Sequence, residues 1–161
     1  MKPRVLSQRS PAAGPAAKFI HCLVLLGALA GGGSARAATD GLAVSHPWIR
    51  MIMPSRPAAG YFILSNATAK VRVLVGATSP ACAMLMLHQS LHQNGQEQML
   101  MLKSLAVPAH GAVTFAPGGY HLMCVSPSKE VTKGRSIPIT LRFADGTSLA
   151  VDFPVRGATG K

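Results

Sequence analysis

The chain has 161 residues, enough for one ordinary domain and too few for two well-formed ones. Hydrophobic residues make up 48% of it and charged residues 13%, which excludes a mainly disordered protein. The formal net charge is +11, but the basic residues are scattered without interleaved aromatic residues, so the composition does not indicate a nucleic-acid-binding protein.

The N-terminal segment has the organisation of a secretory signal. Residues 1–18 contain basic residues and no acidic ones, and residues 19–30 form a mostly apolar run that is too short to span a membrane. A glycine triplet and the A-x-A pattern Ala35-Arg36-Ala37 follow. We therefore expect residues 1–37 to be a signal peptide, cleaved after Ala37, that exports the protein to the periplasm. Cys22 lies inside the apolar run and not after it, so a lipid-anchored cysteine is not expected.

The remaining residues, 38–161, read as one domain of short strands. Turn signals separate the apolar runs, among them Asn94-Gly95, Pro117-Gly118-Gly119 and Asp145-Gly146. No window shows helical periodicity with caps, although residues 126–133 have room for a helical turn. This pattern predicts an all-β, antiparallel Greek-key sandwich or small barrel of eight or nine strands. The candidate strands are 42–48, 60–65, 71–78, 83–88, 99–105, 112–115, 120–125, 137–143 and 148–155.

The domain lacks the residues that most enzymes need. It has no serine nucleophile motif, no phosphate-binding glycine loop and no HExxH sequence. Its five acidic residues are too few and too scattered to suggest paired catalytic carboxylates. No later apolar stretch approaches membrane length. We therefore expect a non-enzymatic domain without a membrane span.

Methionine and histidine, in contrast, are concentrated in three of the candidate strands. They alternate along each strand and so share a face. Thioether and imidazole together suit a soft cation, above all Cu(I), whereas Zn(II) or Ca(II) would require thiolates, carboxylates or more imidazoles. Methionine on a strand face also serves as core packing, so a non-metal interaction module remains the alternative. The residues are Met84, Met86 and His88, then Met99 and Met101, then His121 and Met123.

The spacing of four of these residues resembles a known family. His88, ten residues, Met99, twenty-one residues, His121, one residue and Met123 reproduce the H-x10-M-x21-H-x-M signature of the PCu(A)C-type periplasmic copper chaperones. Further segments are similar to the same family across nearly all of residues 38–161. These are Pro47-Trp48-Ile49-Arg50, Ala58-Ala59-Gly60-Tyr61, Pro117-Gly118-Gly119-Tyr120-His121-Leu122-Met123 and Phe143-Ala144-Asp145-Gly146.

The resemblance implies a cupredoxin-like β-sandwich that binds one Cu(I) through His88, Met99, His121 and Met123. Met101 is the alternative to Met99, because it lies two residues further along the same face. The resemblance also implies a monomeric periplasmic carrier that exchanges copper with a partner, such as subunit II of cytochrome c oxidase, which holds the CuA centre, or its assembly factors. Copper sequestration for tolerance would use the same residues.

Two features depart from the family pattern. Leu87 and Gln89 flank His88, where an acidic neighbour is often found. The C-terminus has no Met- and His-rich tail, so the sequence gives little support to a Cu(II) site. His46, Met51 and Met53 are expected to be ordinary surface or core residues.

The two cysteines of the domain are not expected to bind metal. Cys124 is out of phase with Met123, which predicts a buried free thiol, although a disulfide with Cys82 stays open. Cys82 is in phase with His88 but about 20 Å away along an extended strand, too far to share a ligand set. No His or Met follows Cys124, which excludes the blue-copper electron carriers.

Overall fold

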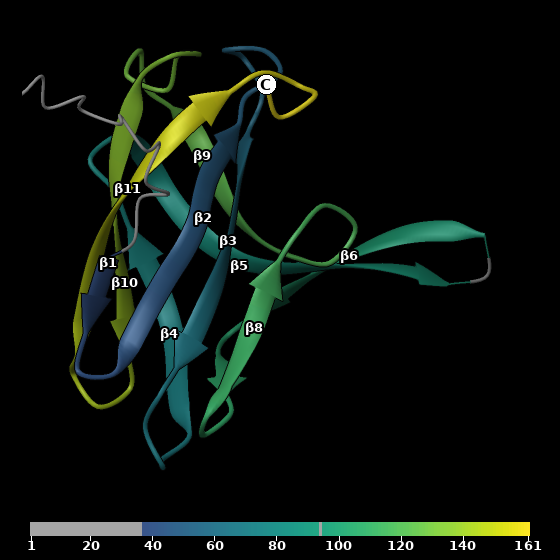
Figure 1. Cartoon of the computed structure of the whole chain (residues 1–161). Helices are drawn as coiled ribbons and strands as arrows, with labels where there is room; N and C mark the ends of the chain where they lie inside the picture. The colour runs from purple at the N-terminus through teal and green to yellow at the C-terminus, as the bar shows by residue number, and fades with distance from the viewer. Residues whose placement is uncertain (1–36, 94) are drawn as a thin grey trace, which may run out of the picture. The chain divides into compact units, whose positions relative to one another are not determined.

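The computed structural model describes residues 37–93 and 95–161, and these residues form strands and turns without a helix (Figure 1). The predicted signal peptide lies outside the described residues, apart from Ala37. No helix able to cross a membrane occurs in the described ranges. The strands are β1 (Ala37–Thr39), β2 (Leu42–Arg50), β3 (Ala58–Asn66), β4 (Arg72–Thr78), β5 (Cys82–Gln93), β6 (Gln96–Leu102), β7 (Leu105–Val107), β8 (Gly111–Phe115), β9 (Tyr120–Pro127), β10 (Ser136–Phe143) and β11 (Ser148–Arg156).

The strands form a single sheet that closes on itself. Hydrogen-bonded neighbours run in the order β6-β5-β9-β8-β3-β2-β11-β10-β4-β7, with β1 beside β2, and a further pairing of β4 with β5 completes the circuit. This arrangement confirms the predicted all-β, cupredoxin-like fold. The prediction of an antiparallel sheet is wrong at two places, because β2 pairs with β11 and β8 pairs with β9 in parallel. Strands β2 and β11 are far apart in the chain and are not joined by a hairpin. Strands β8 and β9 are consecutive and flank the Pro117-Gly118-Gly119 turn.

Strand boundaries differ from the sequence prediction in three ways. The predicted strand 99–105 is two strands, since the chain bends at Lys103 and Ser104 and β7 then pairs with β4. Strand β1 was not predicted. Residues 126–133, which had room for a helical turn, do not form one: β9 continues to Pro127, and a tight turn follows in which the Val131 N–H donates to the Ser128 carbonyl.

The glycine turns are confirmed. Gln93 pairs with Gln96 across the β5–β6 turn, where Gly95 has a φ of 74°, and Gly146 has a φ of 87° in the β10–β11 turn. These positive φ values cost glycine little and a residue with a Cβ considerably more. The β5–β6 hairpin extends from the rest of the sheet as an arm (Figure 1).

Alternation along the strands divides each of them between an inner and an outer face. The inner face is apolar and closely packed: the Phe62 ring stacks on Phe115 at 4.1 Å and meets Phe153 edge-on at 5.5 Å. Gly60 lets β3 approach its neighbours closely, because a Cβ there would lie 3.1 Å from Ile49 Cδ1 and 3.2 Å from Leu122 Cβ. The outer face of β5 and β9 carries the methionines and histidines.

A disulfide between Cys82 and Cys124 links β5 to β9 on the inner side. The predicted free thiol at Cys124 is therefore wrong, although the residue is fully buried as expected. Strict alternation along the strands would place the two cysteines on opposite faces. It fails at the start of β5, where Ala83 and Met84 are both exposed. Cys82 consequently faces the core with Leu85, within a Cα–Cα distance of 5.4 Å from Cys124.

Candidate metal centre

The outer faces of β9, β5 and β6 bring the predicted site residues into one region. In the register of these strands His88 is directly opposite His121 on one side and Met101 on the other. Residues opposite each other in neighbouring strands project to the same face. Met123 lies two residues from His121, and Met99 two residues from Met101, so all five side chains share this face.

His88 is a buried polar side chain without a partner. Its ring is 9% exposed, and neither Nδ1 nor Nε2 has a hydrogen-bond partner among the described residues. Burial lowers the pKa of His88, and the neighbouring His121 lowers it further, so the ring is neutral at neutral pH. A neutral imidazole keeps a lone pair available for a metal ion.

His121 is held in one orientation by the turn that precedes it. Its Nδ1 lies 3.1 Å from the Gly119 carbonyl oxygen, which can only accept, so Nδ1–H is the donor. This leaves the Nε2 lone pair free. The same arrangement orients metal-binding histidines in many proteins. The His88 and His121 rings meet edge to face with their centroids 5.7 Å apart.

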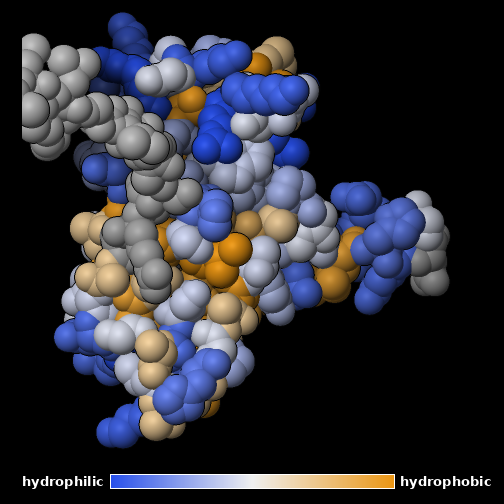
Figure 2. All heavy atoms as spheres, in the orientation of Figure 1, coloured by the Kyte–Doolittle hydropathy of each residue, from blue (hydrophilic) through white to orange (hydrophobic). Residues whose placement is uncertain are grey.

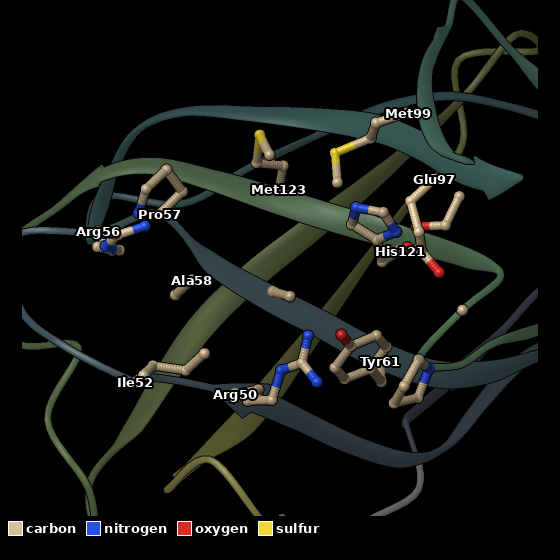
Figure 3. A pocket seen from close by; sticks show the side chains of 14 residues that line it. Arg50, Ile52, Arg56, Pro57, Ala58, Tyr61, Glu97, Met99, His121 and Met123 are labelled. Atoms are coloured by element: carbon tan, nitrogen blue, oxygen red, sulfur yellow. The ribbon is translucent and has the colours of Figure 1, made fainter. Parts of the chain in front are cut away.

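The thioethers complete this region from two strands. Met99 and Met123 line the same pocket as His121, and Figure 3 shows the sulfur atoms of both on the side of the pocket where the His121 ring lies. Met99 is 54% exposed and projects from the arm, whereas Met123 is half-buried. Met101 is 64% exposed and is absent from the lining of this pocket. Met99, His121 and Met123 thus line one pocket, whereas His88 and Met101, which are directly opposite each other in the sheet, do not line it.

The pocket has a volume of about 480 Å³ and a second, basic wall. Arg50 lines it from β2, across from the methionines, and Arg56 lines it from the loop that follows β2. Figure 3 places Arg56 at one end and Glu97 at the other, beside His121. No ion pair is formed by either arginine within the described parts of the chain. The pocket therefore combines soft donors with cationic side chains that have no carboxylate partner in those parts.

A row of rings connects the histidines to β2. Tyr61 is buried, its ring centroid lies 4.8 Å from that of Trp48 and 6.5 Å from that of His121, and the Arg50 guanidinium carbon lies 5.3 Å from its centroid. Burial raises the pKa of the Tyr61 hydroxyl, and the Arg50 charge opposes that rise. Tyr61 is therefore a neutral phenol that supports His121 from the side.

The donor set suits a soft metal ion better than a hard one. No group of three or more His, Cys, Asp or Glu side chains is placed to hold a metal in the described residues. Two imidazoles with two thioethers form a neutral set of soft and borderline donors, as Cu(I) prefers. His46 lies at a bulge in β2, Met51 packs against the core and Met53 is exposed, and none of them lines the pocket.

Sequence reasoning missed the residues that support the donors. Tyr61 on β3, Arg50 on β2 and Arg56 in the loop between these strands contribute to the pocket, and their position near β9 follows only from the sheet order. One feature of the sequence could have pointed to this wall. The chain has one Trp and two Tyr, and the Trp and one of the Tyr, Trp48 and Tyr61, contact each other beside the pocket.

Comparison with known proteins gives a family match over most of the described chain. The model of the LpqE-like family, whose members are named as lipoproteins, matches residues 42–155. A protein of Leifsonia xyli subsp. xyli (strain CTCB07), named as lipoprotein Lxx21020, is 35% identical over 122 residues, which cover 75% of this chain and 73% of the relative.

Solved structures with the same fold include PCuAC domains, which confirms the resemblance predicted from the sequence. The copper-bound PCuAC domain from PmoF2 matches with a TM-score of 0.63 at 24% identity, covering 76% of this chain and 97% of that domain. DR1885 from Deinococcus radiodurans matches in its apo form with a TM-score of 0.57 at 27% identity, over 94% and 97% of the two chains. Its Cu(I) form matches with the same TM-score at 30% identity, over 79% and 83%.

Proposed function

Because the chain belongs to the LpqE-like family and shares the fold of the PCuAC domains, we propose that it is a copper carrier. It binds one Cu(I) through His88, Met99, His121 and Met123 and passes the ion to a partner by ligand exchange. The observation that carries this proposal is the buried His88 ring, whose two nitrogens have no partner in the described residues. Burying an unpaired polar ring is unfavourable, and a metal ion that the ring binds would offset that cost.

The burial of the donors supports exchange rather than permanent storage. The histidines are nearly buried, and His121 is held by the Gly119 carbonyl, whereas Met99 is mostly exposed on an arm that extends from the sheet. An exposed thioether dissociates and allows a partner's ligand to enter before the histidines release the ion. Copper therefore stays bound throughout the exchange, and no catalytic step is required. The partner is a periplasmic copper protein, with the CuA-bearing subunit of cytochrome c oxidase as one example.

Export before loading is part of the same proposal. Residues 1–37 are the signal peptide and residues 38–161 are the released carrier. The disulfide between Cys82 and Cys124 is typical of an oxidising compartment. Cys22 is then the one remaining cysteine to which a lipid could be attached, and it lies in the segment that is removed. The mass of the protein purified from the periplasm distinguishes cleavage after Ala37 from lipid attachment at Cys22.

An anaerobic Cu(I) titration against a competing chelator tests the proposal. The parent should bind one tight equivalent. The quadruple variant His88→Ala, Met99→Ala, His121→Ala, Met123→Ala should bind none while retaining its strand signature in circular dichroism. Equal binding by both proteins, or by neither, would show that the methionines serve only as packing.

Two matched single variants decide which arm methionine is a ligand. Met99→Leu should weaken Cu(I) binding by about tenfold or more, because it removes a donor at nearly constant volume. Met101→Leu is the control, since it is equally exposed on the same strand but lies outside the pocket. A larger loss for Met101→Leu would assign Met101 in place of Met99.

A further inference from the structure

The basic wall of the pocket has no assigned role in holding copper. Arg50 and Arg56 carry permanent positive charges, which repel a bound cation. Neither forms an ion pair in the described residues, although Glu97 lines the same pocket. Two unpaired guanidinium groups beside a copper site therefore require a different explanation.

We propose that this pocket receives an acidic segment of the copper-exchanging partner, whose carboxylates pair with Arg50 and Arg56 while an adjacent soft donor of the partner reaches the copper. The inference rests on the proposed function and specifies the chemistry of the partner. The charge complementarity is local: Arg50 lies across the pocket from Met99 and Met123, and Arg56 lies at one end of the same pocket. Guanidinium and carboxylate form strong paired hydrogen bonds, and Arg is the usual residue for this purpose.

The surroundings of the arginines fit a docking role. Arg50 is held over the Tyr61 ring, so its position is set before a partner arrives. The loop beyond it exposes Ile52, which is 59% exposed and lines the pocket. Together with Met99 this side chain adds apolar surface beside the charged groups. A cavity of about 480 Å³ holds a few side chains of a partner and is too small for a folded element.

The proposal predicts that copper transfer prefers a thioether ligand carrying a carboxylate. Two peptides that differ only in charge provide the probes: acetyl-Met-Gly-Asp-amide and acetyl-Met-Gly-Asn-amide. The rate at which each removes Cu(I) from the loaded protein is measured by stopped flow under anaerobic conditions. We expect the Asp peptide to react about tenfold faster at low ionic strength, and the difference to shrink at high salt.

Charge-matched variants separate this pocket from the general basicity of the protein. Arg50→Gln with Arg56→Gln should abolish the preference for the Asp peptide. Arg142→Gln with Lys129→Gln removes the same charge from residues outside the pocket and should preserve it. If Arg50→Gln perturbs the Tyr61 ring, the exposed Arg56→Gln alone should still reduce the preference.

The outcomes for the two proposals are distinguishable. If the parent does not bind Cu(I), the proposed function fails. If it binds one Cu(I) but reacts equally with both peptides, or if both double variants lose the preference to the same extent, the docking proposal alone is overturned. Acetate, added at the concentration of the peptides, tests whether a free carboxylate competes for the arginines. The proposal is supported if acetate slows Cu(I) removal by the Asp peptide only, and only in proteins that retain Arg50 and Arg56.

Discussion

The inner and outer faces of strands β5 and β9 differ in composition: the inner face carries packed apolar side chains, and the outer face carries the histidines and methionines. On the inner face Leu87 and Leu122 pair with each other, are nearly fully buried, and lie on the same face as the disulfide. On the outer face the adjacent residues His88 and His121 are also nearly buried, and neither ring nitrogen of His88 has a partner in the described residues. The comparison shows that burial alone does not identify a packing residue. What distinguishes the faces is whether buried polar atoms have partners.

The hydrophilic tip of the arm sharpens the same contrast. Figure 2 shows a hydrophilic end on the extended hairpin and hydrophobic surface nearer to the body. The tip contains Gln93, Gln96 and Glu97, whereas Met99 and Leu100 stand nearer to the base with 54% and 44% of their surface exposed. The large exposed apolar residues of the arm therefore lie toward its base, on Met99, Leu100 and Met101.

Removing the disulfide should produce the largest change. The bond closes a sequence separation of 42 residues, so the double variant Cys82→Ala, Cys124→Ala should lose about 4 kcal/mol of unfolding free energy. Chemical denaturation measures the loss. Because the disulfide ties the two strands that carry three of the four proposed ligands, Cu(I) affinity should fall as well. Unchanged stability would mean that inner-face packing alone holds β5 to β9.

Leu122→Ala and Met123→Ala form a matched pair across the two faces. Leu122 is fully buried, and its truncation should cost about 3 kcal/mol because it leaves a cavity in the core. Met123 is half-buried, and its truncation should cost about 1 kcal/mol or less. Met123→Ala, in contrast, should weaken Cu(I) binding more than Leu122→Ala does. Similar effects of the two variants on both quantities would contradict the division between faces.

His88→Leu should stabilise the metal-free protein. The substitution replaces a buried ring whose nitrogens lack partners with an apolar side chain, and we expect a gain of about 1 kcal/mol. Cu(I) binding should be lost in the same variant. Thermal unfolding without metal and a Cu(I) titration measure the two effects, with His88→Gln as the polar control. A destabilised His88→Leu protein would show that the ring has a packing role.

The smallest effect is expected far from both faces, at the β10–β11 turn. The Thr147 backbone N–H donates to Asp145 and Arg72 pairs with it at 2.8 Å, which together hold the pKa of Asp145 below its ordinary value of 3.8. Ionised Asp145 therefore contributes stability above its unfolded pKa, and the contribution is lost as the pH falls through the folded pKa. Asp145→Asn should flatten the acid side of the stability–pH curve slightly and leave Cu(I) binding unchanged. An altered affinity at neutral pH would mean that this turn communicates with the site.

The strand pattern and the shared face of the methionines and histidines were accessible from the sequence because both depend on local alternation, whereas the choice of four ligands came from the family resemblance and remains a prediction. The run from His121 to Met123 and the turn before it lie within a few residues, and the tight-turn glycines have unambiguous conformational roles. The fold was therefore predicted nearly strand by strand.

What escaped prediction depends on long-range placement. The pocket wall of Arg50, Arg56 and Tyr61 exists because β3 lies between β9 and β2, an order that no local pattern encodes. The disulfide was missed for a related reason. Strict alternation assigned Cys82 and Cys124 to opposite faces, and only the irregular start of β5, where Ala83 and Met84 are both exposed, brings them together.

The disulfide also sets an order of events for maturation. Before it forms, the chain offers two thiols, and a thiolate is a stronger ligand for Cu(I) than any thioether. Cys124 is the neighbour of Met123 in the chain, so an ion that arrived early would be captured on the core side of β9 and would obstruct closure of the sheet. Oxidation removes that competitor. If the chain carries copper as proposed above, it has to be oxidised first and metallated second, so newly made protein and loaded protein would differ in their thiols as well as in their metal.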